Sequence, residues 1–190
     1  MAAKKAAKKA AKKTATKAAK KTPKHHGAEQ DLRRAYEHMG RLRAIQDGLS
    51  PLIVAQIGTL TKLAQASLRT EGGKSAADLL RAGEHFAFGS LASPLKESGL
   101  SSALEHAISA QYEHLLDKAA EHWDRHKSVR SAPVASLYKS AYATAESAYA
   151  NGAYRKALEF ARGAEALAHV RDGHMVFDDG SSSAKRKLKG

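Results

Sequence analysis

The first 27 residues contain no leucine, isoleucine, valine or aromatic residue, so this segment has no side chain with which to join a hydrophobic core. Nineteen of these residues are alanine or lysine, and the unit AAKK occurs three times in tandem. Both residue types favour helix, but the mutual repulsion of ten lysines opposes it. We therefore expect residues 1–27 to be disordered in the free protein, which leaves the fold to the rest of the chain.

The positive charge of the chain is concentrated at its two ends. The formal net charge is +13, yet residues 28–179 carry 18 basic and 19 acidic side chains, which leaves that stretch at −1. Residues 1–27 contribute ten lysines and no acid, and residues 180–190 form a second basic tail without an acid. This distribution indicates that the tails, rather than a basic globular surface, meet an anionic partner.

Several classes of protein are excluded by what the sequence lacks. Without cysteine there is no disulfide framework, thiolate nucleophile or cysteine zinc site. No apolar run approaches the roughly 18 residues that span a bilayer, and the basic N-terminal segment has no apolar stretch typical of a secretory signal. We expect a soluble intracellular protein with no cofactor and no membrane partner, nucleoid-associated in the cytoplasm if bacterial and nuclear if eukaryotic.

Residues 28–179 show helical periodicity and almost no strand pattern, with abundant alanine and prolines at boundaries. The pattern predicts a single all-α domain of about six helices, packed as a bundle or a stack of hairpins. Helices are expected over residues 29–47, from 51 to the Gly72-Gly73 break, and over 75–91, 102–127, 133–150 and 154–170, with a turn or short helix at 93–99.

Capping residues mark the ends of these helices. Ser50-Pro51 and Pro133 are typical of helix starts, and Ser75–Asp78 and Ser102–Glu105 have the spacing of capping boxes. Gly48 and Asn151-Gly152 are stop signals.

Apolar residues at three- and four-residue spacing predict the faces that enter the core. The helix from residue 51 is the most apolar, and we expect it to be the most buried, through Ile53, Ile57, Leu60, Ala64 and Leu68. The 102–127 helix presents Leu104, Ile108, Tyr112, Leu115, Ala119 and Trp123. The 133–150 helix carries two adjacent stripes, one of Leu137, Ala141, Ala145 and Ala148 and one of Tyr138, Tyr142 and Tyr149. Two stripes predict either that the helix is buried between neighbours or that one face is buried and the other is exposed for binding. We interpret the tyrosines as core rather than as a platform for stacking bases.

The N-terminal tail resembles the lysine- and alanine-rich tails of linker histones and bacterial histone-like proteins. The resemblance rests on the AAKK repeats between Ala2 and Lys13, on Lys17, Lys20 and Lys21, and on the unit Thr22-Pro23-Lys24. It implies that the tail coats duplex DNA with little sequence preference. We expect the phosphate-binding residues to be Lys4, Lys5, Lys8, Lys9, Lys12, Lys13, Lys17, Lys20, Lys21, Lys24, Lys185, Arg186, Lys187 and Lys189.

Residues 133–171 resemble a single tetratricopeptide-like helical hairpin. Gly152, Tyr154, Ala157 and Ala164 match that family's inter-helix turn and its small packing positions. The resemblance implies a hairpin that supports a protein-binding face.

Ten histidines raise the question of catalysis or metal binding. His122 and His126 lie one helical turn apart and could share a metal ion, but a zinc site needs a third ligand, so we favour a solvated polar face. Arg33-x4-His38 and Arg162-x6-His169 resemble the arginine-to-histidine spacing of the HEPN ribonuclease families, which implies a helical ribonuclease as an alternative. Gly72-Gly73-Lys74-Ser75 has only the last residues of a phosphate loop, and we interpret it as a linker with a helix N-cap.

The function that these observations favour is non-enzymatic. The lysine tail would bind DNA, with RNA as an alternative, through sequence-independent phosphate contacts, while the helical domain mediates self-association or binds a protein. The alternatives are a helical protein-interaction module with an incidental basic tail, and the HEPN-like ribonuclease. We expect no catalytic and no metal-binding residues.

Overall fold

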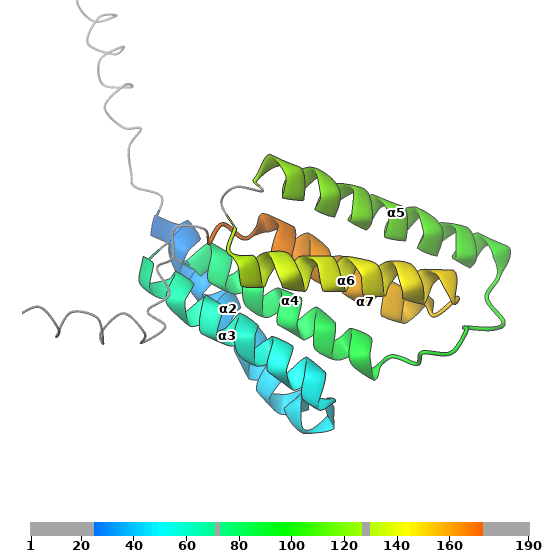
Figure 1. The fold of residues 1–190 in the computed structure, drawn as a ribbon, viewed down its shortest axis with the longest axis horizontal. Helices are drawn as coiled ribbons and strands as arrows, with labels where there is room; N and C mark the ends of the chain where they lie inside the picture. The colour runs from blue at the N-terminus through cyan, green and yellow to red at the C-terminus, as the bar shows by residue number, and fades with distance from the viewer. Residues whose placement is uncertain (1–24, 71–72, 127–129, 173–190) are drawn as a thin grey trace, which may run out of the picture.

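Two helices that are far apart in the sequence form the centre of the molecule. The computed structural model describes residues 25–70, 73–126 and 130–172, and within these ranges every regular element is helical, as predicted. The elements are α2 (His25–Ile45), the 3₁₀ helix η1 (Gln46–Gly48), α3 (Pro51–Thr70), α4 (Gly73–Leu91), α5 (Ser102–Arg125), α6 (Ala132–Ala150) and α7 (Tyr154–His169). α4 and α7 pack against each other, α2 and α3 pack on α4, and α5 and α6 pack on α7 (Figure 1).

The prediction that residues 51–70 form the most buried helix is wrong. α3 covers one side of α4, and Leu52 on its outer face is 68% exposed. α4 and α7 are buried on several sides because each has helices packed around it, although both are rich in alanine and α4 also contains three glycines. Burial here follows position in the bundle rather than the apolar content of the helix.

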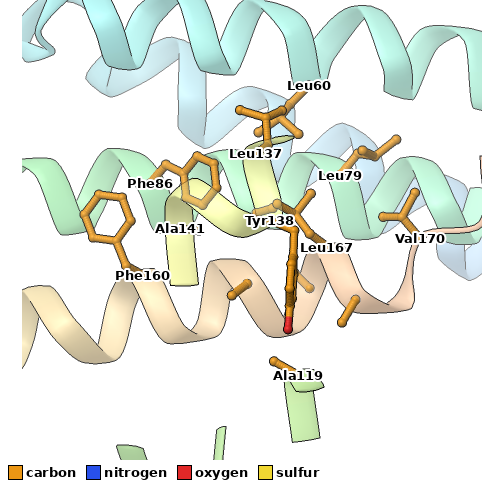
Figure 2. Close-up of a cluster of buried hydrophobic side chains, with 14 of the residues drawn as sticks. Leu60, Leu79, Phe86, Ala119, Leu137, Tyr138, Ala141, Phe160, Leu167 and Val170 are labelled. Carbon is orange, nitrogen blue, oxygen red and sulfur yellow. The ribbon is translucent and has the colours of Figure 1, made fainter. Parts of the chain in front are cut away.

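Glycine lets the two central helices approach closely. A Cβ at Gly163 of α7 would lie 2.6 Å from Cε1 of Phe86, and a Cβ at Gly89 of α4 would lie 2.8 Å from the ring of Phe160. The two phenylalanine rings stack with their centroids 5.7 Å apart, and Figure 2 shows them between α4 and α7. Each ring therefore occupies the space above a glycine on the opposite helix, where any other residue would force the backbones apart.

α6 has both of its stripes in contact with neighbours, as one of the two predicted arrangements requires. Leu137 and the stripe's alanines are buried, and α6 packs on α7. The tyrosine stripe meets aromatic residues of α5: Tyr138 stacks on Trp123 with centroids 3.9 Å apart, and Tyr149 stacks on Tyr112 at 4.1 Å. Figure 2 shows Tyr138 extending toward Ala119 of α5. Tyr138 is therefore a core residue, as predicted, and Tyr149 is held in the α5–α6 aromatic layer.

Several predicted helix ends are confirmed. α3 begins at Pro51, and the Ser50 hydroxyl accepts a hydrogen bond from the backbone N–H of Ile53 at 3.5 Å. α6 has a proline in its first turn and ends before Gly152, whose φ of +71° lies in the left-handed region. These signals are local, so the sequence alone specifies them.

Other predicted ends are corrected by the structure. α2 begins at His25, four residues before the predicted start and inside the segment expected to be disordered. Gly73 lies within α4 rather than in a break. A Cβ there would be 2.6 Å from the backbone nitrogen of Leu32, so glycine allows α2 and α4 to approach closely at this position. Ser75 consequently lies inside the first turn instead of capping it. The cap of α5 is Ser101, whose hydroxyl accepts from the N–H of Leu104 at 3.3 Å, so the predicted box begins one residue late.

The connection between α4 and α5 contains no helix, although a short one was an expected possibility. It lies against the turn between α6 and α7, where the N–H of Glu97 donates to the carbonyl of Gly152 at 3.0 Å and the N–H of Arg155 donates to the Glu97 carboxylate at 2.7 Å. Across residues 25–70, 73–126 and 130–172, we find no helix that is both long and apolar enough to cross a membrane.

Candidate functional site

A pocket lined by basic side chains lies at one end of the bundle. Its volume is about 460 Å³, and it is bounded by the start of α4, the last turns of α5, the end of α7 and the residues just after α7. Among the described residues, none of those that line it is acidic. We call it the cationic pocket, and its lining is Lys74, Ser75, His122, Arg125, His126, His169 and Arg171.

The antiparallel packing of the central helices assembles this pocket. Arg81 of α4 contacts Glu165 of α7, and Phe86 contacts Phe160, so the start of α4 lies beside the end of α7. α5 packs on α7 and ends at the same end of the bundle (Figure 1). Three helix ends that are separated by about fifty residues each in the sequence thus bring their terminal side chains together.

A chain of polar contacts supports the inner wall of the pocket. One carboxylate oxygen of Glu165 accepts from the Arg81 guanidinium at 2.9 Å, and the other accepts from Nε2 of His169 at 2.8 Å. The hydrogen bond from His169, opposed by burial and aided by the charge of Arg81, holds the pKa of Glu165 below its ordinary value. Glu165 therefore remains an anion and orients the His169 ring.

The His169 ring in turn meets the ring of His122. The Nδ1 atoms of the two residues are 3.0 Å apart, and the ring planes are nearly perpendicular, at 83°. When Nε2–H of His169 donates to Glu165, Nδ1 of the same ring can accept a hydrogen bond from Nδ1–H of His122. Burial, followed by the nearby charges of His169 and Arg125, lowers the pKa of His122.

The outer wall of the pocket is formed by His126 and Arg171. The Arg171 guanidinium donates to Nε2 of His126 at 3.0 Å, which requires His126 to be neutral at that nitrogen. Desolvation and then the charge of Arg171 lower the pKa of His126. The pKa values of His122 and His126 are thus lowered first by burial and then by the positive charges near them.

Two other clusters of charged residues pair within themselves. Glu84 accepts from His38 at 2.5 Å and from Arg41 at 2.5 Å, which joins α2 to α4. Burial alone would raise the pKa of Glu84, but these hydrogen bonds outweigh it and leave the pKa lowered. On the α4–α7 contact, Glu159 accepts from His85 at 2.8 Å and from Arg162 at 2.6 Å. The pairs of Glu84 with His38 and Arg41 and of Glu159 with His85 join two helices, and the Glu159–Arg162 pair lies within α7. These satisfied contacts contribute to the fold rather than to a binding surface.

The predicted DNA-binding residues fall outside the described part of the chain. All ten lysines of the N-terminal tail and the four basic residues between Lys185 and Lys189 belong to residues 1–24 and 173–190. The prediction that they bind phosphate remains a prediction.

The structure shows the contacts of the two arginine–histidine pairs on which the ribonuclease alternative rests. Arg33 pairs with Glu37 on the surface, whereas His38 turns toward Glu84. Arg162 pairs with Glu159, whereas His169 pairs with a different carboxylate, that of Glu165. Both histidines are thus held by glutamates, and the ribonuclease interpretation stays a prediction.

His122 and His126 do lie near each other at the cationic pocket, but each turns to its own partner rather than to a shared third ligand. No group of three or more histidines, aspartates or glutamates among the described residues is arranged to hold a metal ion.

Sequence reasoning missed the pocket as a unit. The sequence places Lys74 and Ser75 at the end of a phosphate-loop-like string, with Ser75 also in a predicted capping box, and it contains no signal for Arg125 or Arg171. Their shared property is position, since all lie in the first or last turn of a helix or just beyond it. Comparison of the chain with known protein families, with curated proteins and with solved structures finds no match.

Proposed function

We propose that this protein binds nucleic acid without sequence preference through its lysine-rich N-terminal segment, and that its helical domain serves self-association or binding of another protein. The observation that carries the proposal is the separation of charge: fourteen of the 32 basic residues lie in two terminal segments that contain no acid, and the intervening residues are nearly neutral. Each lysine that neutralises a phosphate releases a condensed counterion, which favours binding without reading bases.

The arrangement of the helical domain supports this proposal. α2 begins at the same end of the bundle where the described chain stops, after α7 (Figure 1). The start of α4 lies next to both: Gly73 is beside Leu32 of α2, and Lys74 lines the same pocket as Arg171, which follows α7. Both basic segments are therefore joined to one end of the domain, so a single stretch of nucleic acid can meet both, and dimerisation would add avidity.

The salt dependence of binding tests the role of the lysines. Affinity for a random-sequence duplex would be measured against salt for the full chain and for a full-length variant with the ten N-terminal lysines changed to glutamine. With six to ten phosphate contacts, the slope of log K against log salt should be on the order of −5 to −9, and it should become shallow in the variant. Circular dichroism would verify that the variant keeps its helical content. A steep slope that survives the substitutions would contradict the proposal.

Exposed apolar side chains on α2 and α3 favour protein association as the role of the helical domain. Tyr36 is 58% exposed and lies beside a small groove of about 150 Å³ between α2 and α3. Leu32 and Leu52 are also exposed, at 39% and 68%. Sedimentation of the full chain and of Tyr36→Glu tests self-association: a dimer that dissociates in the variant would support it, and a monomer in both would leave this surface to a different protein.

A further inference from the structure

We propose that the cationic pocket is a binding site for a phosphoryl group, present either as inorganic phosphate or as the phosphate monoester of a nucleotide. The site is separate from the lysine tail, and the inference does not depend on the function proposed for that tail. It rests on the charge, position and size of the pocket formed by described residues.

The lining of the pocket carries cations and no acid, although carboxylates lie just behind it. Lys74, Arg125 and Arg171 carry fixed charges, and three histidines add titratable ones. Three carboxylates lie close behind the lining: Glu121 pairs with Arg125, Glu165 pairs with both His169 and Arg81, and Asp78 lies 3.7 Å from Arg81. Burial raises the pKa of Asp78, against the charges of Arg81, His169 and Lys74. Guanidinium and ammonium groups that converge from several elements are the donors that recognise phosphoryl oxygens.

Lys74 lies at the end of its helix that is less favourable for a cation, with Asp78 one turn further along α4 as the nearby carboxyl group. Basic residues in the last turns of α5 and α7 are stabilised by the negative ends of those helices. Lys74, in contrast, lies in the first turn of α4, which contains no acidic residue, so its charge meets the positive end of the helix. A bound anion would relieve both this conflict and the repulsion between Lys74 and the other cations of the pocket.

The histidines connect the site to pH. His122 is faced by His169 and Glu165 of α7 and by Glu121 and Arg125 of its own helix. His126 is faced by Arg171, Arg130, Arg125 and His122. The lowered pKa of each histidine reflects burial and an excess of positive neighbours, and an anion among them would raise both values. Binding should therefore take up protons and become tighter as the pH falls.

The size of the pocket agrees with such a ligand. At about 460 Å³, it lies within the range typical of small-molecule sites and has room for a phosphate together with an attached group. Its walls consist mainly of charged and polar side chains, which suits an anion better than an apolar ligand.

Histidine resonances of the full-length protein provide a site-specific test. Inorganic phosphate would be titrated at constant ionic strength maintained with chloride, and the ring signals of His122, His126 and His169 followed by NMR. We expect saturable shifts with one common Kd, while His106, which is exposed near the start of α5 and contacts the carbonyl of Ser102, stays unchanged. Shifts that do not saturate, or that His106 shares, would overturn the proposal.

A matched pair of double variants separates the site from general electrostatics. Lys74→Gln with Arg171→Gln removes two exposed cations from the pocket, and Arg43→Gln with Lys118→Gln removes two exposed cations elsewhere. The first should weaken phosphate binding about tenfold or more, because two charge-assisted contacts are lost, whereas the second should change it less than about twofold. Equal effects of the two double variants would contradict a defined site.

Two further arms identify the source of the phosphoryl group and the role of the histidines. Adenosine 5′-monophosphate and adenosine would be compared with inorganic phosphate, and binding of adenosine as tight as that of the monophosphate would overturn the proposal. Tighter binding of the monophosphate assigns the site to nucleotides, and tighter binding of phosphate assigns it to the free ion.

Sulfate, whose charge is constant between about pH 5.5 and pH 8, should bind more tightly at the lower pH, because a bound anion favours the protonated forms of His122 and His126. Binding of sulfate that does not depend on pH would remove the histidines from the site. The variant with ten lysines changed to glutamine should keep the phosphate-induced shifts, so failure of the tail proposal and failure of the pocket proposal give different results.

Discussion

Arg130 lies over the indole ring of Trp123, with Cζ 4.3 Å from the ring centroid, and donates a hydrogen bond to the carbonyl oxygen of the same tryptophan at 2.7 Å. Its second terminal nitrogen donates to the carbonyls of His122, at 2.8 Å, and of Ala168. One guanidinium therefore satisfies carbonyl groups at the C-terminal ends of both α5 and α7, where its positive charge also complements the two helix dipoles.

Loss of this residue should destabilise the fold. We expect Arg130→Met to lower the free energy of unfolding by about 2–4 kcal/mol, because three partly buried carbonyls lose a charged donor. Arg130→Lys should cost about half as much, since an ammonium keeps the charge but lacks the planar fork. Urea unfolding followed by the fluorescence of Trp123, the one tryptophan of the chain, provides the measurement. A loss below about 0.5 kcal/mol in Arg130→Met would show that water replaces the guanidinium.

The close approach of α4 and α7 predicts opposite effects of the same substitution at two glycines. In Gly163→Ala, the new methyl group would meet the ring of Phe86, which is 1% exposed and has little room to move. We expect a loss of about 1–3 kcal/mol from overpacking. Gly58→Ala is the control, because a Cβ there has no neighbour within 4 Å and alanine favours helix by up to about 1 kcal/mol. Thermal unfolding should separate the two variants, and equal melting temperatures would refute the packing argument.

Acid should weaken the contacts of Glu84, Glu159 and Glu165. Each has a folded-state pKa below its ordinary value of 4.5. Their contribution to stability is therefore fully present above pH 4.5 and is lost as the pH falls from there through the folded-state pKa values. Glu84→Gln should cost about 1–3 kcal/mol near neutral pH, and its stability should fall less steeply below pH 4.5. Urea midpoints across the acid range test this, and parallel curves for the two proteins would contradict it.

The aromatic layer between α5 and α6 should respond to alkali. Burial raises the pKa of Tyr112 and of Tyr138 to about 12, from an ordinary value of 10.0. Because the folded-state values are raised, this contribution to stability is present below pH 10 and is lost as the pH rises toward 12. A spectrophotometric titration should show these two tyrosines ionising late, and Tyr138→Phe should remove one late group. Ionisation of all six tyrosines in one step near pH 10 would contradict the buried stacks.

Much of the helical structure follows from local signals in the sequence. Ser50-Pro51 starts a helix and Gly152 ends one because capping and left-handed backbone depend only on adjacent residues. The spatial order of the helices could not be obtained in this way. Gly89 and Gly163 lower the helix propensity of their own segments. In the folded chain they allow the close contact of α4 and α7, because each makes room for a phenylalanine about seventy residues away, Phe160 and Phe86 respectively.

The same distinction applies to the candidate sites. The separation of charge is a property of composition and can be found without a structure. The cationic pocket depends on the antiparallel order of α4 and α7, and Lys74 and Arg171, almost one hundred residues apart, meet only through that order. The segment Gly73-Lys74-Ser75 can be assigned to a candidate anion site only once the ends of α5 and α7 are known to lie beside it.

The uneven burial of α5 has a consequence for ligand binding. The buried residues of this helix begin at Tyr112, so its first turns can fray without disturbing the core. His122 and Arg125 belong to the opposite half, which Trp123 and its stacking partner Tyr138 hold in place. These pocket residues are consequently preorganised on the most constrained part of the helix, and a bound anion would lose little affinity to the entropy of ordering them.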